Sequence, residues 1–200
     1  MVKVKSKKKK KSKLIWIIPV GLLILMIVFG IYFLGNICCG TPKITEFTDA
    51  QLRNEIGKYL SEGSKPEGNI SLFSDLKMAI YPGTRLVQIK RGDTDGFGLG
   101  INNLLAGASG DKKFSYNVFV SDLNIQSKCG ISAAVAESWI VTGKSEENII
   151  IPSGDFIVRK VLFTISKDAP LCTIRFRVNV EADGLAYATD FFDMKIKAKR

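Results

Sequence analysis

A long uncharged stretch near the N-terminus predicts a membrane-spanning helix. Residues 14–34 read LIWIIPVGLLILMIVFGIYFL, which is 21 residues without a charged side chain. As an α-helix this stretch would be about 31 Å long, and that length matches the hydrocarbon core of a bilayer. Trp16 and Tyr32 lie near its two ends, where aromatic side chains favour the membrane interface. Residues 14–34 are therefore predicted to cross a lipid bilayer.

The next segment, residues 35–69, predicts an exit linker followed by a short amphipathic helix. Residues 48–51 (TDAQ) have the form of a capping box, and apolar residues recur at helical spacing behind them. Gly63 and Pro66 would end such a helix. The pattern thus predicts a helix over roughly residues 48–61.

From residue 70 onward the apolar period shifts toward two, which is the period of β-strands. Residues 70–80 fit a strand or a helix, whereas residues 172–180 alternate cleanly and Asp183-Gly184 is a hairpin signal. The expected apolar segments are 86–89, 97–101, 114–120, 133–141, 149–151, 156–165, 172–180 and 192–196. Seven or eight short strands separated by turns predict a mainly β domain over residues 70–200, an Ig-like antiparallel β-sandwich.

The last strands resemble a known family of domains. Residues 151–155 (IPSGD), a strand, residues 166–172 (SKDAPLC), a strand and a closing hairpin are similar to the CARDB-type domains, adhesion-related β-sandwiches of archaeal and bacterial surface proteins. Pro82-Gly83 and residues 100–103 (GINN) fit the early strands of such a domain, so the resemblance covers roughly residues 76–198. It implies an extracytoplasmic Ig-like module of surface architecture without a transferable catalytic residue.

The distribution of charge predicts the direction of the span. Eight of the 29 basic residues are lysines within residues 1–13, and Lys43 is the first charged residue after the span. Positively charged flanks are retained in the cytoplasm, so residues 1–13 are expected to form a cytoplasmic tail and residues 35–200 to lie outside the cell membrane. A cleaved signal peptide is the competing interpretation, but no small-x-small cleavage site follows the apolar stretch.

The same distribution argues against a nucleic-acid partner. After residue 13 the chain has 21 basic and 19 acidic residues, a net charge of only +2. A domain that follows phosphates should carry its positive charge on the folded surface. The expected partners are the lipid bilayer and an envelope protein or glycan, and no nucleic acid is expected.

Four cysteines lie after the span. A thiol outside the cytoplasm is expected to be oxidised, and Cys129–Cys172 is the preferred bridge, with two buried free thiols as the alternative. Cys38 and Cys39 adjoin the predicted membrane exit and could pair with a second chain to give a homodimer, carry lipid or stay free. Four cysteines allow three intramolecular connectivities, and the sequence alone does not choose among them.

Candidate chemistry is sparse. The chain has no histidine, which excludes histidine-based triads and most zinc sites, and it has no phosphate-binding or dinucleotide motif. Residues 93–96 (DTDG) resemble part of a calcium loop without its distal glutamate, and an acidic hairpin turn is the preferred interpretation. Residues 91–93 (RGD) spell an adhesion tripeptide that chance explains, and Asn69 begins a glycosylation sequon. No catalytic residue, metal or cofactor is predicted.

These observations favour a non-enzymatic, single-pass membrane protein whose β-sandwich binds or spaces other envelope components. The alternative is an accessory subunit of a membrane or secretion complex, in which the span itself makes the specific contacts. An envelope enzyme that uses Ser/Lys or paired carboxylates is a third hypothesis.

Overall fold

The computed structural model describes residues 43–62, 76–105 and 112–199 together with Met26. Several predictions concern residues outside these ranges, namely the tail 1–13, the span 14–34, Cys38, Cys39 and Asn69. Within the described ranges no helix is long and apolar enough to cross a membrane.

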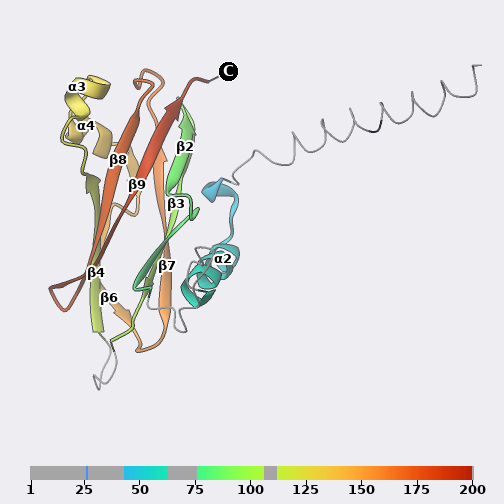
Figure 1. The fold of residues 1–200 in the computed structure, drawn as a ribbon, viewed down its shortest axis with the longest axis vertical. Helices are drawn as coiled ribbons and strands as arrows, with labels where there is room; N and C mark the ends of the chain where they lie inside the picture. The colour runs from blue at the N-terminus through green and yellow to red at the C-terminus, as the bar shows by residue number, and fades with distance from the viewer. Residues whose placement is uncertain (1–25, 27–42, 63–75, 106–111, 200) are drawn as a thin grey trace, which may run out of the picture. The chain divides into compact units, whose positions relative to one another are not determined.

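Two facing β-sheets form the body of the domain (Figure 1). The four-stranded sheet has the order β1 (Met78–Tyr81), β3 (Thr94–Asn102), β7 (Phe156–Thr164) and β5 (Ile140–Thr142). The five-stranded sheet has the order β2 (Leu86–Lys90), β9 (Leu185–Lys197), β8 (Thr173–Ala182), β4 (Lys112–Val120) and β6 (Ser145–Ile151). The prediction of a mainly β sandwich is confirmed.

The core lies between the sheets and follows the predicted alternation. In β8 the apolar residues from Ile174 to Val180 are buried while Arg175, Arg177 and Asn179 are exposed. Four phenylalanines meet at the centre, where the rings of Phe176 and Phe192 stack with centroids 5.4 Å apart. Strands with this alternation bury one face and expose the other to solvent, which is why the pattern of residues 172–180 predicted β8 correctly.

The β8–β9 hairpin turns at Asp183-Gly184, as predicted. Both residues have positive φ, 50° and 78°, which a two-residue type I′ turn requires. However, β9 starts directly after the turn, at Leu185, and is longer than the predicted strand 192–196. Its first half mixes exposed and buried residues after a register shift at Glu181, so a period of two is not visible there.

The prediction that all strands pair antiparallel is wrong for β2. Leu86 to Lys90 run parallel to Asp193 to Lys197 of β9. The reason is that β1 and β2 belong to different sheets, so the turn after Tyr81 transfers the chain across the sandwich instead of folding it into a hairpin.

The apolar segment 133–141 is a short helix and a strand. Ser132 caps the N-terminus of α4 (Ala133–Glu137), because its hydroxyl accepts the Val135 N–H at 3.3 Å, and the alanine-rich sequence of α4 favours a helix. β5 follows it, and α3 (Ile125–Cys129), which was not predicted, precedes it. The described part of the ambiguous segment 70–80 ends in a strand, since β1 begins at Met78.

Helix α2 (Asp49–Glu62) packs on the outer face of the four-stranded sheet (Figure 1). The predicted capping box is present, because the Gln51 N–H donates to Thr48 Oγ1 at 3.2 Å and the Thr48 N–H donates to Gln51 Oε1 at 2.9 Å. Leu52 and Ile56 are fully buried against β3, where Gly98 and Gly100 leave room for them. A Cβ at Gly100 would lie 2.3 Å from Ile56 Cγ2, so glycine is needed for this close approach.

Candidate functional site

A groove of about 670 Å³ runs beside α2 at one side of the sandwich. It exists because β5 pairs only with Leu162 and Phe163, which leaves the first half of β7 with a strand neighbour on one side only. Its lining comes from α2, β4, β5, β6 and β7, and the polar members are Asp49, Arg53, Tyr116, Thr142, Ser145, Glu146, Arg159 and Lys160.

An arginine–glutamate pair lines the groove and joins the two sheets. Arg159 of β7 donates to both carboxylate oxygens of Glu146 of β6, at 2.6 Å and 2.9 Å. The hydrogen bond to Glu146 raises the pKa of Arg159 above its usual value. Arg159 also donates to the Val158 carbonyl at 3.1 Å, so a backbone acceptor at the open strand edge is already occupied.

The other cations of the groove are paired as well. Lys160 lies 2.8 Å from Asp49 and donates to the Phe47 carbonyl at 2.8 Å, and its hydrogen bond lowers the pKa of Asp49. Arg53 lies 3.0 Å from Asp155. With each positive charge matched by a carboxylate, the groove offers hydrogen-bonding groups without a strong field for an ion.

Tyr116 is the titratable group buried deepest in the groove. Burial, together with the nearby Glu146 carboxylate, raises its pKa to about 12. The phenol therefore stays protonated at neutral pH and cannot act as a general base.

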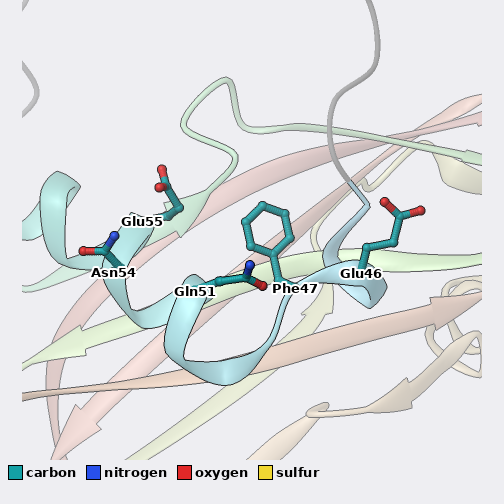
Figure 2. A pocket seen from close by; sticks show the side chains of 5 residues that line it. All are labelled: Glu46, Phe47, Gln51, Asn54 and Glu55. Carbon is teal, nitrogen blue, oxygen red and sulfur yellow. The ribbon is translucent and has the colours of Figure 1, made fainter.

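A second, smaller recess of about 310 Å³ lies along α2 and the 3₁₀-helix η1 (Ile44–Glu46). Figure 2 shows its five lining side chains, which are Glu46, Phe47, Gln51, Asn54 and Glu55. Gln51 is engaged in the capping box, and Phe47 packs edge-on against Tyr81 with centroids 5.5 Å apart. No three metal-ligating side chains gather here or elsewhere in the described ranges.

The calcium-like residues 93–96 do not converge on one point. Asp93 pairs with Lys199 at 3.0 Å, whereas Asp95 accepts N–H groups from Ile44 and Gly96, each at 2.8 Å. The preferred interpretation as a hairpin turn is also wrong, because β2 and β3 lie in different sheets and residues 94–96 already belong to β3. Asp95 instead fixes η1 to the sandwich, and burial raises its pKa.

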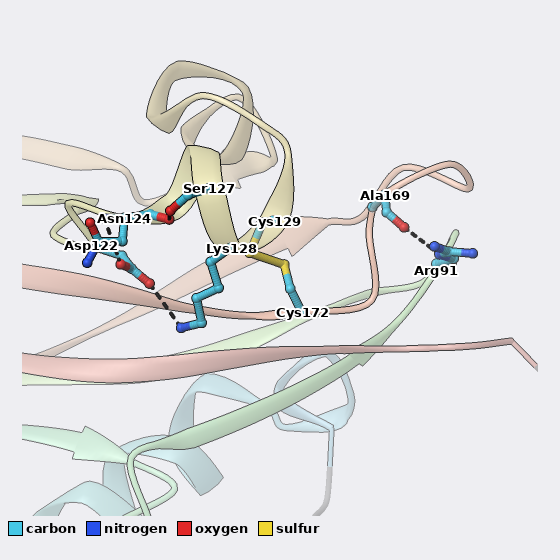
Figure 3. The surroundings of a disulfide bond; sticks show 8 residues. All are labelled: Arg91, Asp122, Asn124, Ser127, Lys128, Cys129, Ala169 and Cys172. Carbon is cyan, nitrogen blue, oxygen red and sulfur yellow. Dashed lines mark hydrogen bonds and ion pairs between the residues drawn. A yellow bond between two sulfur atoms is a disulfide. The ribbon is translucent and has the colours of Figure 1, made fainter.

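One end of the sandwich carries the disulfide (Figure 3). Cys129 of α3 is joined to Cys172 at the start of β8, with the Cα atoms 5.7 Å apart, as the preferred pairing predicts. Next to it Lys128 lies 3.1 Å from Asp122. The bridge fastens a pair of short helices to a core strand across 43 residues of sequence.

Besides Lys128, the same end holds five basic residues, Lys43, Lys90, Arg91, Lys167 and Lys199, which we call the basic end. Arg91 donates to the Ala169 carbonyl, two residues before Leu171, and the Lys167 side chain lies against Gly92. The hydrogen bond from Lys199 lowers the pKa of Asp93, and Lys43 and Lys90 lower it further. The basic end could not be read from the sequence, because its members come from four separate segments.

The adhesion-like tripeptide, residues 91–93, is part of this structure. Gly92 has φ +74°, its N–H donates to the Ile165 carbonyl at 2.8 Å, and the charged neighbours on both sides are bound to other parts of the domain. A structural role therefore accounts for the tripeptide.

Comparison with known proteins gives no family. No protein-family model and no curated protein matches the sequence. Among solved structures, the periplasmic chaperone SfaE is similar at 10% identity and a TM-score of 0.37, with 62% of this chain and 57% of that chain covered. A family 123 glycoside hydrolase from Clostridium perfringens is similar at 12% identity and a TM-score of 0.36, with 57% of this chain and 22% of that chain covered.

A third similar structure is the alkylpurine DNA glycosylase AlkC from Pseudomonas fluorescens, at 12% identity and a TM-score of 0.31, with 60% of this chain and 30% of that chain covered. The chain thus spans less than two thirds of each of these three proteins. Structural similarities this weak give no information about the function of this chain.

Proposed function

We propose that the chain is a single-pass membrane protein whose β-sandwich is a non-enzymatic binding or structural module outside the membrane. The observation that carries the proposal is the disulfide between Cys129 and Cys172. Disulfides persist in oxidising compartments, which is where the lysine-rich tail and the apolar stretch 14–34 would send this domain.

The strand arrangement supports an Ig-like type for the sandwich. Four strands in one sheet and five in the other, with the first strand divided between the sheets as β1 and β2, resemble the two-sheet plan of Ig domains. Membership of the CARDB-type surface domains, which the final strands resemble, is part of the same proposal.

The groove beside α2 supports binding over catalysis. Its cations are neutralised by carboxylates of the domain, and its buried phenol holds its proton. We propose that an envelope protein or glycan is bound there through hydrogen bonds to groups such as Ser145 and Thr142. A photo-crosslinker at Ser145 should then capture an envelope component, while one at the exposed Gln88 of β2, on the far edge of the five-stranded sheet, should not.

The redox state of the disulfide in living cells tests the proposed location. In a variant with Cys38→Ser and Cys39→Ser, a maleimide-polymer reagent added during lysis should leave the protein unmodified. After reduction it should add to both Cys129 and Cys172. Modification of both cysteines without reduction would place the domain in a reducing compartment and overturn the proposal.

A further inference from the structure

We propose that the basic end of the sandwich docks on a lipid surface that carries anionic headgroups. The inference rests on the proposed function, since the predicted span is what holds the domain next to a bilayer. It adds an orientation: the end with the disulfide faces the membrane and the β8–β9 hairpin points away.

Charge is the first argument. The basic end has five positive side chains, and the carboxylates among or next to them are Asp93, Asp168, Asp95 and Glu46, so its net charge is +1. Asp93 is paired with Lys199, whereas Lys90 and Lys167 are exposed and form no ion pair with a described carboxylate. Lysines placed near an anionic leaflet are attracted to it over about one Debye length.

Two exposed leucines at the same end are the second argument. Leu123 is 98% exposed in the loop before α3, and Leu171 is 55% exposed beside the disulfide. A single exposed leucine needs no explanation, but two at the end that carries the lysines match the composition of surfaces that lie in the headgroup region. Figure 1 places α3 and the end of β9 at the same end of the sandwich, and Figure 3 shows Cys172, which directly follows Leu171, joined to α3.

The tether is the third argument. Eight residues, 35–42, separate the predicted span from Lys43, and eight residues reach at most about 30 Å. Lys43 is itself a member of the basic end, where the following residue, Ile44, donates its N–H to Asp95. A tether of this length lets the basic end reach the bilayer surface.

The opposite end supplies a matched control. Leu185, at the start of β9, is 74% exposed, so it resembles Leu123 in residue type and exposure. The 13 residues of β9 separate it from the basic end by about 40 Å. Near Leu185, Lys112 lies 2.7 Å from Asp183, and Glu147 and Glu181 add negative charge. A membrane contact at the basic end must leave Leu185 in water.

The test uses the full chain with Cys38→Ser and Cys39→Ser, reconstituted into vesicles with headgroup-labelled nitroxide lipid. A fluorophore is attached at Leu123→Cys in one protein and at Leu185→Cys in the other. In an equal mixture of phosphatidylcholine and phosphatidylglycerol the first fluorophore should be quenched and the second should not. High salt, or phosphatidylcholine alone, should relieve the quenching.

Charge variants make the test quantitative. Lys90→Gln with Lys167→Gln should lower the ratio of docked to undocked domain by about 25-fold, at about fivefold for each lysine. Lys113→Gln with Arg177→Gln removes the same charge from exposed positions away from the basic end and should leave the ratio unchanged.

Each other outcome contradicts a specific step. Vesicle flotation of the chain with equal quenching at both positions, or with quenching that ignores anionic lipid, would overturn the docking and leave the anchor standing. A chain that does not float with the vesicles would overturn the anchor, and the docking with it.

Discussion

The contact between α2 and the four-stranded sheet gives a prediction that can be worked out atom by atom. Gly100→Ala places a Cβ 2.3 Å from Ile56 Cγ2, far inside van der Waals contact. Ile56 is fully buried and branched at Cβ, so its methyl group cannot move aside without a shift of the helix. Overpacking of this kind costs about 1–3 kcal/mol, and we expect Gly100→Ala to reduce the free energy of unfolding by that amount.

A double-mutant cycle isolates the cause. Ile56→Ala alone should cost about 2–5 kcal/mol, because it removes a buried side chain and leaves a cavity. In the double variant the new Cβ enters the space that Cγ2 has left. The loss for Gly100→Ala with Ile56→Ala should therefore be smaller than the sum of the single losses by at least about 1 kcal/mol.

Urea denaturation of residues 42–200 with the disulfide oxidised measures all four free energies. The packing is assigned wrongly if Gly100→Ala costs nothing, or if the two substitutions add without coupling. Either result would mean that α2 does not lie on β3 as described.

Three further changes test other contacts. Tyr187→Phe removes the hydroxyl that donates to the Asn102 carbonyl at the end of β3, at 2.7 Å, and accepts the Leu104 N–H just after it, at 3.0 Å. The loss should be about 1–2 kcal/mol in urea denaturation, and no loss would contradict these bonds. Cys129→Ser with Cys172→Ser should cost about 4 kcal/mol from the chain entropy of a 43-residue loop, and an unchanged midpoint would mean that the bridge does not form. The hydrogen bond from Arg175 lowers the pKa of Asp193 in the folded protein. The pair therefore stabilises the fold at pH values above the unfolded-state pKa of Asp, about 3.9. This stabilisation is lost as the pH falls through the lower folded-state pKa. Asp193→Asn should flatten that acid dependence by less than about 1 kcal/mol, because Arg175 is half exposed, and an unaltered pH profile would refute the assignment.

The sequence predicted those elements whose local pattern agrees with their final packing. The alternation of residues 172–180 survives as β8, and the capping box at Thr48 begins α2. Asp183-Gly184 makes the expected turn because only a few residue types tolerate two successive positive φ values. Each of these signals is local, so no distant contact was needed to interpret it.

Other features depend on partners far away in the chain. The parallel pairing of β2 with β9 follows from the turn after β1 changing sheets, which no local pattern shows. The sequence predicted the strand of residues 97–101, but it did not show that Gly98 and Gly100 are required by Leu52 and Ile56, more than 40 residues earlier in the chain. The GxGxG spacing from Gly96 to Gly100 was the available signal for this close approach.

The candidate sites were hidden for the same reason. The Arg159–Glu146 pair joins strands of different sheets, and the basic end combines Lys43, Lys90 and Lys199 from opposite parts of the chain. Only the disulfide could be proposed beforehand, because cysteines are few and their chemistry outside the cytoplasm is restricted.

Protease protection on intact cells, with a tag at each end of the chain, tests the central claim most directly. We predict that protease added outside removes the C-terminal tag and leaves a membrane-bound fragment with the N-terminal tag. A C-terminal tag that resists digestion until the cells are broken would contradict the proposed topology, and with it the extracytoplasmic location of the β-sandwich.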